Sequence, residues 1–236
     1  MAKRPAKPAG KVAAASIASP VPCATPVPPA VLHISKAVWP TGRLIHRIHQ
    51  DLYASSAFNP GVKGNARFSP IKTAVGVSIP TFYGGTTFDC AAMETVFHDV
   101  PFAAGFKSLD KRKLEGQVHS VLLPTKDLVL ADLSTVALRK LGIERSQLID
   151  TESAHYPNTR QWAQAIHAQC LDIQGLYWVS RQDDRARAVM LFGDRIDAAT
   201  LVPQGASRNV MLDPDAYVEV LALADRIGVS LITGKS

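Results

Sequence analysis

Apolar and polar positions along the chain switch between strand-like and helix-like spacing from about Val38 onward. Short runs rich in apolar, β-branched and aromatic residues, bounded by turn residues, predict strands. These runs are 42–49 (GRLIHRIH), 66–71 (ARFSPI), 81–87 (TFYGGTT), 117–124 (QVHSVLLP), 127–133 (DLVLADL), 175–180 (GLYWVS), 187–193 (RAVMLFG) and 199–203 (ATLVP). The strand content is therefore high and is spread over most of the chain.

Helical spacing lies between these runs. Thr86 with Asp89 three residues later forms a capping box for a helix that runs through Ala91, Glu94 and Phe97. The other predicted helices are 134–141, closed by Gly142, 158–170, with Trp162, Ala165, Ile166 and Cys170 near one face, and 214–227, with Asp213 as N-cap and Pro214 at the first helical position. This mixed order predicts an α+β fold, because regular strand–helix–strand units are too few for a doubly wound sheet.

The first part of the chain has a different composition. Residues 1–37 are rich in Ala, Pro and Val, and SPVPCATPVPPAV lies at their centre. Proline lacks the amide donor and restricts the residue before it, so helix and central strand are both disfavoured. A signal peptide is a weak interpretation, because the apolar stretch is short and interrupted by prolines. We expect a disordered basic tail over 1–37 and one folded domain over 38–236.

Charge is concentrated in the same segment. The net charge is +6, but the first 40 residues hold five basic and no acidic residues, which leaves +1 for the rest of the chain. A basic tail can contact phosphates without sequence specificity. Specific binding of nucleic acid by the folded part is therefore not expected. No apolar run approaches the roughly 18 residues of a membrane-spanning helix, so membrane insertion is not expected either.

Cysteine and histidine usage excludes several classes of site. Cys23, Cys90 and Cys170 are odd in number and far apart, which argues against a disulfide framework and a structural zinc site. Cys90 and Cys170 are expected to be small buried apolar residues in a reducing, cytoplasmic compartment. The seven histidines have no metal-ligand spacing, and His46, His49 and His98 are expected to be surface or partly buried residues.

Common catalytic motifs are also missing from the sequence. It contains no GxxxxGK[ST] phosphate loop, no GxGxxG after a strand, no HExxH and no GxSxG. What remains is a set of polar residues in apolar surroundings: Arg47, Arg67, Tyr83, Glu94 and Ser180. Each alone has a simpler structural explanation, such as a surface arginine, a packed tyrosine or an exposed helix glutamate.

The order of these pieces resembles the RES domain family, which is named for an arginine, a glutamate and a serine. The matching segments are RLIHRIH, NPGVKGNARFSPI, PTFYGGTTFDCAAMETVFHDVP, GLYWVSRQDD and VMLFGDR, which together span about 43–195. The N-terminal extension has no counterpart in the compact members of that family. The distance between Glu94 and Ser180 is also long.

The resemblance implies an ADP-ribosyltransferase-like fold with a split β core, flanking helices and a cleft for NAD. It implies an enzyme that consumes NAD as its substrate, by hydrolysis, phosphorolysis or ADP-ribosyl transfer to a protein acceptor, and it does not imply a metal. Many members of the family are toxins neutralised by a helix-turn-helix antitoxin, through which contact with nucleic acid would be indirect. A homodimer is left open.

The resemblance also implies roles for individual residues. Glu94 and Arg47 correspond to catalytic residues, and Arg47, Arg67, Tyr83 and Ser180 to NAD-binding residues. A carboxylate can stabilise the oxocarbenium-like transition state of glycosidic cleavage. Arginine forks suit the pyrophosphate, and a tyrosine ring can stack on nicotinamide beside glycines that admit the ligand.

A serine hydroxyl can donate to a phosphate or ribose oxygen. An alternative is a non-catalytic interaction protein with an eroded NAD cleft. The presence of Glu94 together with both Arg47 and Arg67 favours an active enzyme over this alternative.

Overall fold

The computed structural model describes residues 24–234 as one α+β domain. The strands are β1 (Lys36–Trp39), β2 (Ile45–Gln50), β3 (Ile71–Lys72), β4 (Ser78–Ile79), β5 (Thr81–Gly85), β6 (Lys107–Asp110), β7 (Gln117–Pro124), β8 (Leu128–Asp132), β9 (Gly175–Val179), β10 (Arg187–Phe192), β11 (Leu201–Pro203), β12 (Arg208–Asn209) and β13 (Val229–Ile232). The α-helices are α1 (Phe88–Met93), α2 (Thr135–Leu141), α3 (Arg145–Leu148), α4 (Tyr156–Gln169) and α5 (Pro214–Arg226).

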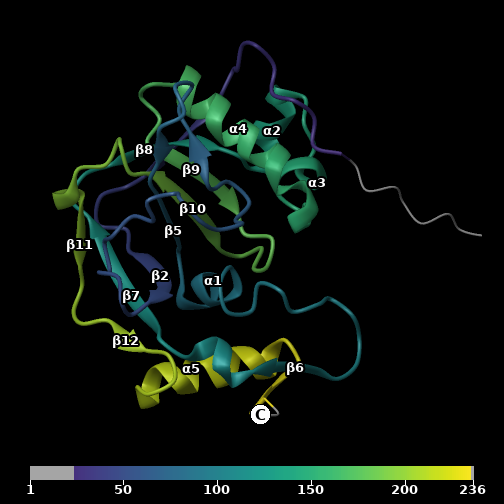
Figure 1. Cartoon of the computed structure of the whole chain (residues 1–236), viewed down its shortest axis with the longest axis vertical. Coiled ribbons are helices and arrows are strands. Elements are labelled where there is room, and N and C mark those ends of the chain that lie inside the picture. Colours follow the sequence, from purple (N-terminus) through teal and green to yellow (C-terminus); the bar gives the residue numbers. More distant parts are fainter. Residues whose placement is uncertain (1–23, 235–236) are drawn as a thin grey trace, which may run out of the picture.

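One curled sheet contains most of the strands (Figure 1). Its order is β1-β8-β9-β10-β5-β2-β7-β11, and β12 also pairs with β7. Neighbouring strands are antiparallel except for β8 and β9, which are parallel. This confirms the α+β fold class, because a doubly wound sheet would be mostly parallel.

The sheet is nearly divided between β5 and β2. Five residue pairs join β10 to β5 and six join β2 to β7, but only His46 and Gly85 are in register between β2 and β5. A Cβ at Gly84 would overlap Ile45 Cγ2, and a Cβ at Gly85 would lie 2.5 Å from Cys90 Sγ. Glycine is therefore required here by close packing of the chain itself, and not only by a ligand as the sequence suggested.

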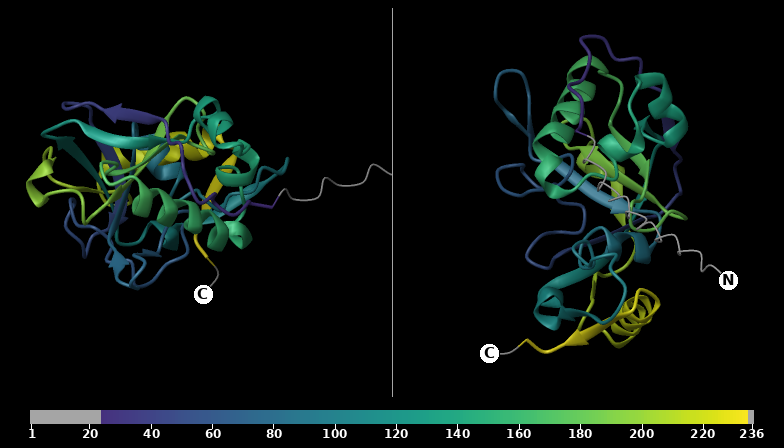
Figure 2. Two further views of the ribbon diagram at one scale, coloured as in Figure 1. Left: turned by 90° about the horizontal axis from the view of Figure 1, so that it is seen from above. Right: turned by 90° about the vertical axis from the view of Figure 1, so that its right-hand side faces the viewer.

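Helices cover the two halves separately. Trp162, Ala163 and Ile166 of α4 share a core with Leu176 and Trp178 of β9. A second core joins α1 and α5 to the parallel pair β6–β13. In Figure 1 and the right view of Figure 2, α5 lies at the opposite end of the molecule from α2 and α4. A third core, which contains Ile45 of β2 and Phe82 of β5, spans both halves of the sheet and joins them.

Helix ends with local signals were predicted correctly. Ser134 caps α2, and Gly142 ends it with φ 66°. Asp213 caps α5 and accepts from Ala216 N at 2.9 Å, with Pro214 following at the first position. Both ends depend on residues within one helical turn, which is why the sequence was sufficient.

The predicted helix through Glu94 was partly wrong. The N-cap is Thr87 and not Thr86, because the Thr86 hydroxyl accepts from Arg187 N at 3.0 Å. The helix ends at Met93, so Glu94 is its C-cap residue and Phe97 lies in the turns that follow. A contact with β10 therefore displaced the expected capping box.

Part of the predicted tail also needs correction. Residues 24–37 pack on the domain: Thr25 Oγ1 donates to Gln147 O at 2.6 Å, and Trp162 Nε1 donates to Pro26 O at 2.7 Å. Strand β1 then pairs with β8 at the edge of the sheet. Proline-rich chain cannot form helices but can still supply carbonyl acceptors. Residues 1–23, with Cys23, lie outside the described residues.

Cys90 is fully buried, and its thiol lies 3.6 Å from Arg187 O. Burial raises the pKa of this thiol to about 12, which agrees with its expected role as a small buried residue. Cys170 is half-buried at the end of α4. None of the helices between residues 24 and 234 is long and apolar enough to cross a membrane.

A chain of hydrogen bonds joins α5 to the divided part of the sheet. Glu219 pairs with Arg208 at 2.8 Å, and Arg208 donates to His119 Nδ1 at 3.1 Å. His119 Nε2 then lies 3.0 Å from His46 Nδ1. Because Arg208 can only donate, His119 must accept at Nδ1 and donate from Nε2, which holds both histidines neutral. Burial lowers the pKa of His119 to about 3.

We predict that removing residues 1–37 lowers the melting temperature relative to removing residues 1–23 alone. The longer deletion removes half of β1, the Leu32 contact with the core and the acceptor of Trp162. The loss should be about 2 kcal/mol or more, since it combines apolar burial with an unsatisfied buried donor. Thermal melts of the two truncated proteins check this. Equal melting temperatures would show that residues 24–37 do not contribute to the stability of the domain.

The histidine chain predicts a loss of stability in mild acid. His119 has an ordinary pKa of 6.5 and a lowered one in the fold, so its contribution is complete above pH 6.5 and falls as the pH drops toward 3. The slope should approach 1.4 kcal/mol per pH unit. Denaturant melts from pH 7 to 4 should show a shallower slope for His119→Gln. Exposed His33→Gln is the control, and an unchanged slope in the His119 variant would refute the assignment.

Candidate functional site

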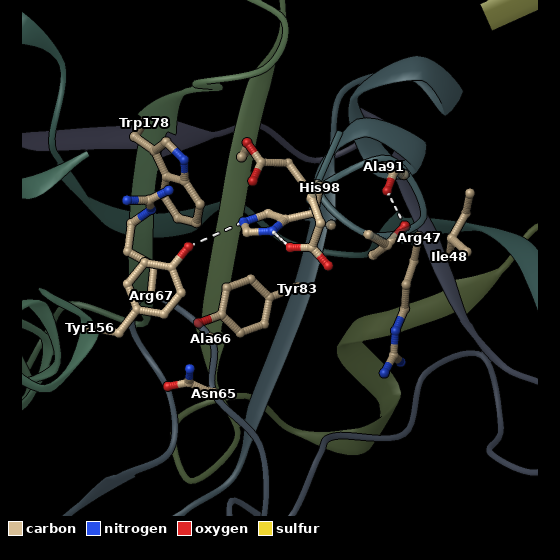
Figure 3. A pocket seen from close by; sticks show the side chains of 15 residues that line it. Arg47, Ile48, Asn65, Ala66, Arg67, Tyr83, Ala91, His98, Tyr156 and Trp178 are labelled. Atoms are coloured by element: carbon tan, nitrogen blue, oxygen red, sulfur yellow. Dashed lines mark hydrogen bonds and ion pairs between the residues drawn. The ribbon is translucent and has the colours of Figure 1, made fainter. Parts of the chain in front are cut away.

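A cavity of about 390 Å³ opens where β5 and β2 meet (Figure 3). Four of the five residues singled out in the sequence line it, and they come from separate elements: Arg47 from β2, Arg67 from the loop before β3, Tyr83 from β5 and Glu94 from the end of α1. The weak contact between the two halves of the sheet therefore positions the candidate site.

Ser180, the fifth residue, lies behind the cavity wall. It directly follows β9 and is fully buried. Its hydroxyl donates to Glu94 Oε1 at 2.7 Å and accepts from Gln182 N at 3.0 Å and Asp183 N at 3.1 Å. With its donor and acceptor capacity used, Ser180 orients Glu94, which differs from the direct ligand contact expected from the sequence. The second carboxylate oxygen of Glu94 is left for the cavity.

Arg67 is buried, and its guanidinium is fixed by hydrogen bonds to the protein. It is only 6% exposed, and its NH1 donates to Thr151 O at 3.0 Å and to Thr151 Oγ1 at 2.8 Å. Its guanidinium lies 5.2 Å from the centre of the Tyr156 ring. Burial lowers the pKa of Arg67, and the fixed contacts leave only part of its fork for a ligand.

Arg47 occupies another side of the cavity. Its NH1 donates to Ser55 O at 2.9 Å and Ala57 O at 2.7 Å, and its guanidinium stacks on Phe82 at 4.4 Å. Burial lowers the pKa of Arg47 to about 10. In Figure 3 the side chain lies across the cavity from Arg67 and Tyr156. Arg47 also lines a second cavity of about 380 Å³ and therefore lies between the two cavities.

Tyr83 presents its ring to the cavity and directs its hydroxyl elsewhere. The hydroxyl accepts from Phe68 N at 3.2 Å, and burial raises the pKa of Tyr83 to about 12. The ring meets Trp178 edge to face, with 6.5 Å between centroids. A flat ligand could therefore use the ring surface, as the sequence suggested, but not the phenolic oxygen.

Several lining residues were missed in the sequence. His98, expected to be a surface or partly buried residue, is partly buried and lines the cavity four residues after Glu94. Its Nδ1 lies 3.0 Å from Asp99 Oδ1, and its Nε2 lies 3.2 Å from the Tyr156 hydroxyl (Figure 3). The hydrogen bond from His98 lowers the pKa of Asp99. Spacing from Glu94 was a usable signal for His98, whereas nothing in the sequence marked Tyr156 or Trp178.

The cavity is lined by equal numbers of positively and negatively charged side chains. Two guanidinium groups, of Arg47 and Arg67, share it with the carboxylates of Glu94 and Asp99. Such a lining suits a ligand that carries both negative and positive groups. Within residues 24–234, no cluster of three or more His, Cys, Asp and Glu residues is arranged to hold a metal ion.

Comparison with known proteins adds two findings. A family model described as the RES domain matches residues 44–213. The chain is also similar in fold to a chain in the crystal structure of the MbcT–MbcA toxin–antitoxin complex of M. tuberculosis. The TM-score is 0.56 and the sequence identity 16%, over 79% of this chain and 92% of that one. No curated protein matches the chain.

The contacts of Arg67 predict a structural cost for its removal. Arg67→Ala should lower the free energy of unfolding by about 1 to 3 kcal/mol, because the buried Thr151 hydroxyl loses its donor while the Thr151 carbonyl keeps only the hydrogen bond from Arg181. Arg185→Ala, at a side chain that is 80% exposed, is the matched control and should change stability by less than about 0.5 kcal/mol. Urea unfolding of both variants checks this. Equal stability of the two would place Arg67 at the surface in solution.

Proposed function

Because the chain belongs to the RES domain family, we propose that it is an NAD-consuming enzyme that cleaves the bond between nicotinamide and ribose. The observation that carries the proposal is the Glu94 carboxylate, fixed through one oxygen by buried Ser180 and presented in a cavity with Arg47, Arg67 and Tyr83. Pre-oriented charge of this kind is what an enzyme needs where a cation develops in the transition state.

Glu94 supports the bond cleavage electrostatically. When the bond between ribose C1′ and the nicotinamide nitrogen breaks, its electron pair leaves with nicotinamide and the ribose becomes oxocarbenium-like. The free oxygen of Glu94 would stabilise that positive charge or hold the incoming nucleophile. Because Ser180 donates to the other oxygen, the carboxylate needs little reorganisation when the charge appears.

The position of Arg47 supports an extended ligand. It lines both the cavity that contains Glu94 and the second cavity beside it. A pyrophosphate held at Arg47 would place nicotinamide against Tyr83 in the first cavity and adenosine in the second. Guanidinium groups bind phosphate oxygens with charge-assisted hydrogen bonds, which suits a dianionic link between two rings.

A toxin–antitoxin pair is the proposed setting. The matching solved chain is part of a toxin–antitoxin complex, and by analogy we assign this chain the toxin role with a helix-turn-helix antitoxin as partner. The acceptor of the ADP-ribosyl group is water, phosphate or a protein side chain. Identifying the adenine-containing product of an incubation with NAD separates these three.

Replacement of Glu94 tests the chemistry. Glu94→Gln keeps the size and polar tip but removes the charge, so turnover of NAD should fall by roughly two to three powers of ten while NAD affinity changes little. Glu115→Gln, at an exposed glutamate, is the matched control and should keep wild-type turnover. Initial rates of nicotinamide release, with melts to confirm equal folding, provide the measurement.

Two results would contradict the proposal. A folded Glu94→Gln protein with near wild-type turnover would remove the carboxylate from the mechanism. Wild-type protein that leaves NAD intact with water, phosphate and cell lysate all offered as acceptors would favour the non-catalytic interaction protein instead.

A further inference from the structure

The second cavity, beside Arg47, differs in charge from the first. Its lining includes Arg47 of β2 and Lys63 of the loop between β2 and β3, and none of the described residues that line it is an aspartate or a glutamate. The first cavity, by contrast, has two carboxylates for its two guanidinium groups. A lining whose only charges are positive favours a negatively charged part of a ligand.

Two neighbouring residues do not change this charge. Burial lowers the pKa of His49, which also lines the second cavity, so its ring is neutral near neutral pH. Its Nδ1 donates to Gln50 O at 2.9 Å, and its Nε2 accepts from Ser120 Oγ at 2.8 Å. The carboxylate of Asp51 lies beside Gly116, in the turn before β7, and is not part of the lining. The charge of the cavity therefore belongs to the arginine and the lysine.

The two basic side chains differ in what they already bind. Arg47 NH1 donates to Ser55 O and Ala57 O, and in the proposed function the rest of its fork holds the pyrophosphate. Lys63 is exposed, and its ammonium pairs with no carboxylate within residues 24–234. The adenosine end of NAD carries no charge, so NAD would leave Lys63 without an anionic partner.

The loop that carries Lys63 is fixed to the sheet. Asn59 and Thr81 exchange two backbone hydrogen bonds of 2.8 Å, and Asn59 Oδ1 accepts from Gly61 N at 2.9 Å. Gly61 has φ 72°, and a Cβ there would lie 2.9 Å from Ile79 O, so glycine is required for this close approach. Lys63 follows two residues later, and the backbone from which its side chain extends is thus held beside the cavity.

Aromatic rings in the same lining offer a surface for a base. Tyr53 and Phe58 line the second cavity, and the Phe58 ring packs against Phe82 with 5.5 Å between centroids. Adenine can stack on a ring of this kind. Because the ribose joins the base to the pyrophosphate at Arg47, the ribose hydroxyls also fall within this cavity.

We propose that the second cavity binds an adenosine whose ribose carries a 2′-phosphate, and that Lys63 is the specificity-determining residue that makes oxidised NADP the preferred substrate. The inference rests on the proposed function and deepens it, because the same bond to nicotinamide is cleaved. Other dinucleotide sites select NAD with a carboxylate on the ribose hydroxyls and accommodate NADP with a basic residue. The second cavity has the basic residue without the carboxylate.

The first test measures binding without catalysis, using the full chain and two probes, adenosine 2′,5′-bisphosphate and 5′-AMP. Wild-type protein should bind the bisphosphate about tenfold more tightly, since the 2′-phosphate gains a charge-assisted partner. Lys63→Met should abolish this preference, and Lys63→Arg, which keeps the charge, should retain it. Lys72→Met is the matched control, because Lys72 is an exposed lysine of β3 that lines neither cavity. Titration calorimetry provides the four pairs of affinities.

The second test compares the two dinucleotides as substrates. The kcat/KM of nicotinamide release should be about tenfold higher for NADP than for NAD. Lys63→Met should remove this difference by lowering the value for NADP, while the value for NAD changes less than about twofold, as is typical of a surface substitution.

Several results would overturn the inference: equal affinities for the two probes, a preference that survives in Lys63→Met or is lost equally in Lys72→Met, or a kcat/KM for NAD that equals or exceeds that for NADP. Failure of the proposed function gives a different result. Cleavage of NAD together with equal probe affinities refutes the phosphate site alone. A preference that depends on Lys63, without cleavage of either dinucleotide, refutes the chemistry alone.

Discussion

Strands β2 and β5 approach each other over a stretch in which β5 carries no side chains, and the rest of the structure depends on that approach. Gly84 and Gly85 admit Ile45 and Cys90 into the space that Cβ atoms would take. Only one residue pair is in register, so the two halves of the sheet diverge beyond it. The cavity lies at this divergence, and a core that contains Ile45 of β2 and Phe82 of β5 joins the two halves.

The polar residues of the site are held by the surrounding chain rather than by one another. Arg47 and Arg67 donate to backbone carbonyls. The Ser180 hydroxyl donates to Glu94 and accepts from two backbone amides. Such contacts reduce the flexibility of each side chain before a ligand arrives. A site of this kind gains rate and affinity from orientation, because the entropy of ordering these groups is lost during folding and not during binding.

Sequence was sufficient where structure depends on near neighbours and insufficient where it depends on distant ones. The ends of α2 and α5 follow from capping residues such as Ser134 and Asp213. The identity of Ser180 as a site residue came from a family resemblance, but its role depends on Glu94, 86 positions away. The start of α1 shifted because of a contact with β10, and Lys63 gave no signal at all, since the charge of a cavity lining is visible only when the residues that line it are known.

The strand order has a consequence for how the protein folds during its synthesis. Strand β5 is completed by β10, whose register joins 81–85 to 188–192, and β1 pairs with β8 about ninety residues later. Contacts between such distant segments raise the contact order and slow folding. Because the wall formed by β5, β9 and β10 needs residues up to about 192, a nascent chain emerging from the ribosome can assemble the cavity only late in synthesis. An incomplete chain would therefore be inert, and whatever the cavity does begins only when nearly the whole domain has been made.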